Sequence, residues 1–323
     1  MSRVCSMILQ LIEPVLLFLI SFLSVHYSMP YFIRKARKRG LMVRDMYKPG
    51  KPKVVNLGGL VMFASMYLSL VAAQFFIKNV LPLYIFYFII AAFAMYGLAD
   101  DLLGFVKRNG KVLVLFFVAL PIALITTDTD INLVFFNVEL GRLYGLVFAP
   151  LYVMVVANLV NMYAGYNGLS LGLTIIMLVF ASIKAALGGG FGHVIYLLPL
   201  LGAMCAMMFY NFYPARVLLG NVGTYLIGAG LGAFLVLAGM EFFGVIILIP
   251  HIINFLMWIY WCMIMHREPH VKFAKLRRDG TINPPNGLSM KFLVAKLFRV
   301  TEPQAVLICY AITTAFGLIG LLV

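Results

Sequence analysis

Runs of about twenty apolar residues recur along the whole chain, and these runs limit the folds that it can adopt. Of its 323 residues, 63% are hydrophobic and 11% are charged. A soluble domain cannot bury that much apolar surface, because even a large globule leaves much of its chain at the water boundary. In lipid, a helix of roughly twenty residues satisfies its own backbone and crosses the hydrocarbon. The sequence therefore predicts an all-α integral membrane protein.

We expect about ten transmembrane helices in a single polytopic domain that covers residues 1–323. The first apolar run lacks a clear small-residue cleavage site and is interpreted as a retained helix. The segment 128–142 alternates polar and apolar residues, which predicts a short hairpin outside the membrane. The predicted helices cover residues 8–30, 57–78, 82–103, 111–127, 143–162, 169–188, 194–213, 222–240, 242–265 and 303–323.

Lys and Arg are strongly biased to one side of these predicted helices. Of the 25 basic residues, 21 fall in the alternate connections 31–56, 104–111, 162–168, 214–221 and 266–302. Cytoplasmic connections of membrane proteins carry the excess of Lys and Arg. We therefore expect these five connections in the cytoplasm and both termini on the other side. The same distribution favours membrane lipid over nucleic acid as the reason for the net charge of +14.

Two adjacent carboxylates, Asp100 and Asp101, end the third predicted helix in the sequence YGLADDLLGF. Charged side chains on an apolar helix are costly unless they are solvated, paired or bound to a cation. Adjacent residues on a helix point about 100° apart, so both cannot bind one ion in the same way. We expect one carboxylate to bind metal and the other to position a ligand or water. A solvated helix end is the alternative.

Asparagines follow the fifth predicted helix in the sequence NLVNMYAGYNGL. Asn158 and Asn161 are three residues apart and share a helix face, which predicts either ligand binding or hydrogen bonds between helices. The glycines Gly165 and Gly168 flank Asn167 and let the backbone approach a ligand. The oxygen ligands of Asp and Asn suit Mg²⁺, with Mn²⁺ as an alternative, and do not suit zinc.

Basic residues accompany these oxygen ligands on the predicted cytoplasmic face. The motif MHREPH contains His266, Arg267 and His270, which could hold phosphate oxygens together, although a histidine alone is more often a surface residue. Positive charge is added by Lys48, Lys51, Lys53 and Lys111, for which attraction to anionic headgroups is the simpler explanation. Metal-binding oxygens, glycine turns and cations together indicate a site for a pyrophosphate-bearing donor and a lipid phosphate acceptor.

Four ordered motifs resemble those of the polyprenyl-phosphate N-acetylhexosamine-1-phosphate transferases. They read GLADDLLG, N-x-x-N-x-x-A-G-x-N-G-L-x-x-G, Y-P-A-R-V-x-x-G and H-R-x-P. The sequence A-G-Y-N-G-L is most similar to the dolichyl-phosphate GlcNAc-1-phosphotransferase branch. The resemblance implies transfer of N-acetylglucosamine-1-phosphate, or a related HexNAc-1-phosphate, from a UDP-sugar to polyprenyl or dolichyl phosphate. UMP is released, and the reaction begins the synthesis of a lipid-linked glycan for protein glycosylation.

The resemblance also implies roles for single residues. The implied catalytic residues are Asp100, Asp101, Lys111, His266 and Arg267, of which Lys111 contacts the pyrophosphate and the last two hold phosphate. The implied metal ligands are Asp101, Asn161 and Asn221. The residues expected to bind substrate are Lys48, Asn56, Asn158, Gly165, Asn167, Arg216, Leu218 and His270, with Asn167 near the uridine.

Several positions depart from the family pattern. Asn221 stands where an aspartate metal ligand is usual, and the lost charge should weaken Mg²⁺ binding. Compared with the eukaryotic members, Leu218 replaces an aromatic residue near the uracil, Asn56 replaces a glutamate and Met265 replaces an arginine. These differences favour an archaeal-type enzyme. The expected location is the plasma membrane in a prokaryote and the endoplasmic reticulum in a eukaryote. Members of the family often dimerise, so a homodimer is a further expectation.

Three other classes of protein compete with the transferase interpretation. A catalytically silent relative that binds nucleotide-sugar or lipid phosphate would explain Asn221. A transporter would place charged residues near mid-membrane, whereas the charges here cluster at the ends of predicted helices. The D-x-x-D-G-x-x-A-R signature of the CDP-alcohol transferases is absent from the sequence.

Overall fold

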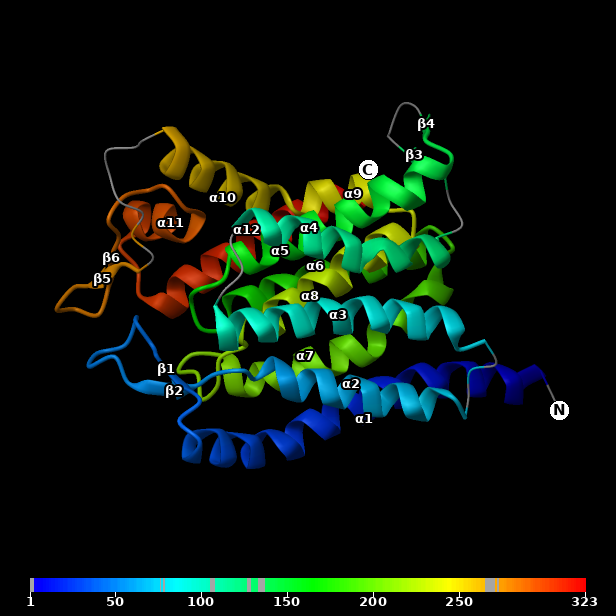
Figure 1. Cartoon of the computed structure of the whole chain (residues 1–323), viewed down its shortest axis with the longest axis horizontal. Coiled ribbons are helices and arrows are strands. Elements are labelled where there is room, and N and C mark those ends of the chain that lie inside the picture. Colours follow the sequence, from blue (N-terminus) through cyan, green and yellow to red (C-terminus); the bar gives the residue numbers. More distant parts are fainter. Residues whose placement is uncertain are drawn as a thin grey trace.

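The centre of the helical bundle is α8 (Gly220–Leu237) in the computed structural model (Figure 1). It is the most buried of the long apolar helices among the described residues. It packs against α3 (Leu81–Leu103), α5 (Ala149–Met162) and α6 (Leu169–Leu187). A helix that is apolar on all sides is stable only when neighbours cover every face, which explains its central position.

The structure describes most of the chain. It covers residues 3–264 apart from 76, 78, 105–107, 127, 128 and 133–136, and residues 271–323 apart from 272. At residues 3–13, 108, 109, 111, 132 and 264 it describes the backbone alone.

The remaining helices surround this centre. The longer ones are α1 (Arg3–Lys38), α2 (Gly59–Ala73), α4 (Arg108–Ala119), α7 (Leu198–Asn211), α10 (Ile249–Ile259) and α12 (Glu302–Leu322), and the shorter ones are α9 (Glu241–Ile247) and α11 (Met290–Phe298). Short 3₁₀ or π segments are η1 (Leu120–Leu124), η2 (Tyr144–Phe148), η3 (Phe191–Leu197) and η4 (Tyr260–Ile264).

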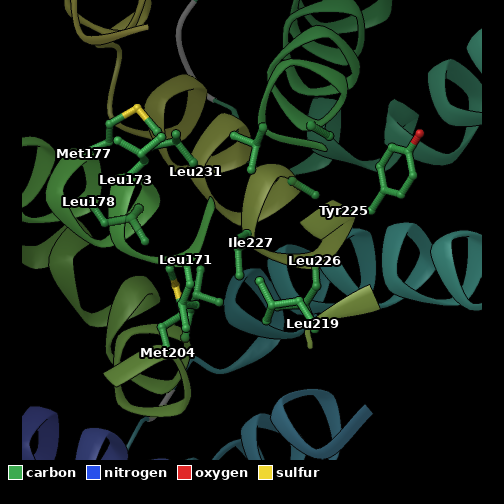
Figure 2. Close-up of a cluster of buried hydrophobic side chains, with 14 of the residues drawn as sticks. Leu171, Leu173, Met177, Leu178, Met204, Leu219, Tyr225, Leu226, Ile227 and Leu231 are labelled. Atoms are coloured by element: carbon green, nitrogen blue, oxygen red, sulfur yellow. The ribbon is translucent and has the colours of Figure 1, made fainter. Parts of the chain in front are cut away.

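Small residues on α8 let its neighbours approach closely. A Cβ added at Gly228 would lie 2.8 Å from Cα of Ala157, and one at Gly232 would lie 3.0 Å from Cα of Val153. The Gly-x-x-x-Gly spacing therefore seats α5 directly against α8, as small residues do between membrane helices. On its other faces α8 meets large side chains of α6 and α7, including Leu171, Met177 and Met204 (Figure 2).

The helices confirm a multi-pass membrane protein. Within the described residues, seven helices are long and apolar enough to cross a membrane, or eight if α9 and α10 form one bent span. The predicted count of ten is not confirmed, because the predicted helices 57–78 and 111–127 are shorter than expected. Their apolar helices cover Gly59–Ala73 and Val112–Leu124. A helix of 15 residues rises about 22 Å, less than the thickness of the hydrocarbon.

The predicted helix 242–265 is broken in the structure. The helices Glu241–Ile247 and Ile249–Met263 meet at an angle of 65°. Pro250 lies in the first turn of α10, where its missing N–H is tolerated and where it cannot continue the preceding helix. The bend carries the end of α10 toward the same end of the bundle as α11 (Figure 1).

Three antiparallel hairpins lie outside the helices. They pair β1 (Met42–Arg44) with β2 (Lys53–Val55), β3 (Asp130–Asn132) with β4 (Asn137–Glu139), and β5 (Lys275–Leu276) with β6 (Ile282–Asn283). The pairing of β3 with β4 confirms the hairpin predicted for 128–142. The other two hairpins were not predicted, and they share the opposite end of the bundle from β3 and β4 (Figure 1).

Candidate functional site

A cavity of about 820 Å³ lies at the end of the bundle that carries β1 and β2. Its walls come from the end of α3, the end of α5, the start of α8 and segments around α10 and α11. Eight of the residues predicted for the site line it, namely Asn56, Asp100, Asp101, Asn161, Gly165, Asn167, Leu218 and Asn221. Segments far apart in the sequence therefore converge on one cavity.

The aspartate pair meets the start of α8. Oδ2 of Asp101 accepts a hydrogen bond from the backbone N–H of Val222 at 3.0 Å, and Oδ2 of Asp100 accepts one from Nδ2 of Asn221 at 2.9 Å. Two carboxylates at the C-terminal end of α3 are disfavoured by the dipole of their own helix. The positive N-terminal end of α8 compensates, because its unpaired N–H groups face them.

Gly220 places these groups in close contact. Its φ of +71° lies in the left-handed region that favours glycine. A Cβ at Gly220 would lie 2.6 Å from Oδ2 of Asp101 and 3.3 Å from Oδ1 of Asn56. The position therefore needs glycine for two reasons, and the side chains of Asn56 and Asp101 both approach it.

The chain before α2 is held beside the start of α8 by backbone hydrogen bonds. The N–H of Leu218 donates to the carbonyl of Val55 at 2.8 Å, and the N–H of Gly58 donates to the carbonyl of Leu218 at 2.9 Å. These hydrogen bonds hold Asn56 and Leu218 next to each other in the cavity wall.

The two asparagines of α5 have different surroundings. Oδ1 of Asn161 accepts a hydrogen bond from the Thr224 hydroxyl at 2.6 Å and lines the cavity. Asn158 accepts a hydrogen bond from the Tyr225 hydroxyl at 3.3 Å and donates to the carbonyl of Met154 at 2.8 Å. It is not among the described residues that line the cavity. Asn158 therefore forms the interhelical hydrogen bond that was the alternative to ligand binding.

Asn167 is buried in the cavity wall and connects three segments. Its backbone N–H donates to Oε1 of Glu302 at 2.6 Å, and its Oδ1 accepts a hydrogen bond from the N–H of Ala215 at 2.9 Å. Glu302 begins α12, so this helix is tied to the turn after α5. The hydrogen bond from Ala215 fixes the orientation of the Asn167 amide in the cavity wall.

The ammonium of Lys48 lies in a buried ionic cluster. It pairs with Oδ2 of Asp45 at 3.0 Å and with the carboxylate of Glu302, and it lies 4.3 Å from the ring centroid of Tyr213. These contacts hold the segment before β2 against α12, behind the wall formed by Asn167. Lys48 is not among the described residues that line the cavity, and its binding of substrate stays a prediction.

Arg216 is not among the described residues that line the cavity. Its guanidinium donates to the carbonyl of Phe209 at 3.0 Å and lies 4.6 Å from the ring centroid of Tyr210. Four other predicted residues stay predictions. His266, Arg267 and His270 lie outside the described residues, and Lys111 is described only as part of the backbone of α4.

Several residues of the cavity were not predicted. Lys291 of α11 lines it, and its Nζ donates to the carbonyl of Ala164 at 3.1 Å, beside Gly165. Arg44 adds a second cation, and Trp258 and Trp261 add aromatic faces. Spacing along the sequence gave no signal for these residues, because the bend at α10 and the hairpins bring them to the cavity.

Two buried phenols of the cavity wall stay neutral. The rings of Tyr47 and Tyr166 meet edge to face, 4.8 Å apart, and both line the cavity. Burial raises the pKa of both hydroxyl groups above the ordinary value of 10.0, and the nearby carboxylate of Glu302 adds to the effect. The Tyr166 hydroxyl donates to the carbonyl of Lys291 at 3.3 Å, and neither phenol acts as a base at physiological pH.

The oxygen donors of the cavity fit a magnesium ion. Asp100, Asp101, Asn161 and Asn221 all present oxygen or amide groups to one space. Among the described residues, no group of three or more His, Cys, Asp or Glu side chains gathers as a metal site. Mg²⁺ does not need one, because it is commonly held by one or two carboxylates together with water and substrate phosphates.

Comparison with known proteins gives a consistent result. Residues 83–239 match the family described as glycosyl transferase family 4. A protein of Saccharolobus solfataricus, provisionally described as a UDP-N-acetylglucosamine–dolichyl-phosphate N-acetylglucosaminephosphotransferase, is 28% identical over 98% of this chain and 97% of its own. A protein of Methanocaldococcus jannaschii, provisionally described as a glycosyltransferase, is 28% identical over 86% of each chain. The phospho-N-acetylmuramoyl-pentapeptide-transferase of Staphylococcus saprophyticus is 27% identical over 65% of this chain and 70% of its own.

Proposed function

We propose that the chain is a transferase of glycosyl transferase family 4, the family that its residues 83–239 match. The proposed reaction moves N-acetylglucosamine-1-phosphate, or a related HexNAc-1-phosphate, from a UDP-sugar to a polyprenyl or dolichyl phosphate. One observation carries the proposal. The carboxylates of Asp100 and Asp101 and the amides of Asn161 and Asn221 converge on one cavity that is bordered by cations. Such a cavity suits a ligand that carries several phosphate charges and a divalent ion.

The proposed reaction is an in-line displacement at the phosphorus that carries the sugar. An oxygen of the lipid phosphate forms the new P–O bond, the bond to the bridging pyrophosphate oxygen breaks, and UMP leaves with that oxygen and its electron pair. A lipid phosphate with a second pKa near about 6 is mostly dianionic at pH 7, so a strong base is hardly needed. Asp100 orients the attacking oxygen or accepts a remaining proton.

We propose that Asp101, Asn161 and Asn221 hold the divalent ion, with Mg²⁺ favoured and Mn²⁺ as the alternative. When bound, the ion offsets the negative charge of the pyrophosphate and of the departing UMP. Lys291 and Arg44 border the same space, and Lys111, His266 and Arg267 are proposed to join them by resemblance. The donor and the acceptor are both negatively charged and repel each other. The positive charge of the ion and of these side chains offsets the repulsion and so raises the rate of transfer.

The proposed cavity opens to the cytoplasm. The supporting observation is the concentration of Lys and Arg in the segments that flank it, because such residues mark cytoplasmic connections. The UDP-sugar is soluble and the acceptor lies in the membrane. A cavity at the helix ends lies at the boundary between water and lipid, where both can reach it. The described lining combines polar groups with aromatic side chains such as Trp258 of α10.

A catalytically silent relative is the second candidate, and Asn221 favours it. An asparagine contributes no charge to a metal site, and here its Nδ2 group donates to Asp100. A silent protein would still bind UDP-sugar. Turnover, rather than binding, therefore distinguishes the two candidates.

The test is a transfer assay on the purified protein in detergent with polyprenyl phosphate and Mg²⁺. Radiolabelled UDP-GlcNAc, UDP-GalNAc and UDP-glucose are offered separately, and label in the organic phase is counted. We expect transfer with an N-acetylhexosamine donor and its loss in Asp101→Ala and Asn161→Ala, both of which should elute as the wild type does. Binding of UDP-sugar without transfer would establish the silent relative, and normal turnover by both variants would contradict the proposed site.

A further inference from the structure

A second cavity, of about 960 Å³, lies between two hairpins at the same end of the molecule. One wall is formed by β1, β2 and the turn between them, and the other by the segment around β5. Its described lining contains five basic residues and no acidic residue, and we call it the hairpin cleft. The basic residues are Arg44, Lys48, Lys51, Lys53 and Lys275.

The hairpin cleft is a neighbour of the cavity that holds Asp100 and is distinct from it. The described linings of the two cavities share only Arg44, Met46 and Phe273. Lys51, Lys53 and Lys275 line the hairpin cleft alone. The cleft therefore has its own set of cations, to which the proposed transfer reaction assigns no role.

Four of the five cations have no carboxylate partner in the described part of the chain. The exception is Lys48, which is buried and paired with Asp45 and Glu302. The side chains of Arg44, Lys51, Lys53 and Lys275 are exposed to the cleft and to solvent. Lys48 and its two carboxylates together carry one net negative charge, and the four remaining cations therefore leave the cleft with a net charge of about +3.

The two walls of the cleft are joined through Tyr47, which precedes Lys48. The N–H of Ala274 donates to the Tyr47 hydroxyl at 3.4 Å, and the rings of Tyr47 and Phe273 lie 6.1 Å apart. Tyr47 is itself buried, at 3% exposure. The cations on the two hairpins are therefore held near one another across a preformed cleft, unlike basic residues on a solvated tail.

We propose that the hairpin cleft binds a phosphate-bearing ligand outside the transfer cavity. Four cations held around one cleft repel each other, and a phosphate dianion relieves this repulsion while offering acceptors to Arg and Lys. The phosphate belongs either to the headgroup of an acidic membrane lipid or to a soluble phosphate compound. Both share the chemistry that the cleft recognises, and the site does not require the transfer reaction.

The experiment compares two triple variants with equal loss of charge. The cleft variant is Lys51→Gln, Lys53→Gln and Lys275→Gln. The control is Arg37→Gln, Lys38→Gln and Arg39→Gln, at the exposed end of α1 and outside the cleft. All six side chains are exposed, so both variants should fold, and elution by size exclusion checks this. An arginine version of the cleft variant keeps the charge and should keep the binding.

Each protein is tested with two probes in the presence of EDTA, which removes divalent ions from the transfer cavity. Inorganic pyrophosphate is titrated by calorimetry, and retention of phosphatidic acid from phosphatidylcholine micelles is measured by native mass spectrometry. We expect the cleft variant to lose about tenfold or more in affinity for one probe, equivalent to about 1.4 kcal/mol. The control should change by less than about twofold.

The two probes separate the two sources of phosphate. A loss confined to pyrophosphate assigns the cleft to a soluble phosphate compound, and a loss confined to phosphatidic acid assigns it to a lipid headgroup. If the cleft variant binds both probes as the wild type does, or if the control loses as much, the proposal is wrong.

Discussion

The substitution Lys48→Met tests the buried ionic cluster behind the cavity wall. Methionine keeps most of the length of the lysine side chain and removes its charge. The side chains of Lys48, Asp45 and Glu302 are 8%, 4% and 2% exposed. The variant therefore leaves two carboxylates buried beside one another without a cation. Removing one partner of a buried ion pair costs about 3–5 kcal/mol, and we expect the free energy of unfolding to fall by that amount.

The assay is equilibrium unfolding of the purified protein in mixed micelles, followed by tryptophan fluorescence. The matched control is Arg299→Met, which breaks the pair between Arg299 and Asp279. These side chains are 71% and 44% exposed, so the control should change stability far less. Adding Asp45→Asn and Glu302→Gln to Lys48→Met should recover most of the lost stability, because no buried charge remains. Equal effects of Lys48→Met and Arg299→Met would refute the reasoning.

Three further predictions concern the cavity. Gly220→Ala should abolish transfer because the added Cβ meets the Asp101 carboxylate. The control is Gly280→Ala, at φ +80° with open space around it. This control should keep activity and lose only about 1–2 kcal/mol of stability in thermal unfolding. Asn221→Asp should lower the Mg²⁺ concentration for half-maximal transfer by about tenfold, the factor given by 1.4 kcal/mol of added attraction, and an unchanged Mg²⁺ titration would contradict this. Lys291→Gln should raise KM for the UDP-sugar while the elution profile stays that of the wild type; an unchanged KM would remove Lys291 from the site.

The aspartates and asparagines of the cavity could be predicted from the sequence because their chemistry conflicts with their surroundings. Carboxylates at the end of an apolar helix are costly, and Asp100 and Asp101 therefore stand out without any structural information. Asn161 and Asn221 also lie at helix ends that flank apolar runs. The structure brings all four to the first turn of one central helix.

Other features depend on long-range contacts that a linear pattern does not encode. Lys48 looks like any other cation of a basic segment, and only the fold brings it to Glu302, 254 residues later. Asn158 shares its spacing with Asn161 but meets Tyr225 instead of the cavity. The bend between α9 and α10 was missed because an apolar run does not distinguish a straight helix from a broken one. Only Pro250 marked the break.

The central claim is that Asp101 and Asn161 hold one divalent ion, and Mn²⁺ binding tests it most directly. Electron paramagnetic resonance of the purified protein with UDP gives the affinity without any turnover. The account predicts one bound Mn²⁺ per chain, with affinity at least about tenfold weaker in Asp101→Ala and in Asn161→Ala. Asn158→Ala, on the same helix but outside the described cavity lining, should bind as the wild type does. Unchanged Mn²⁺ affinity in Asp101→Ala and Asn161→Ala would contradict the account.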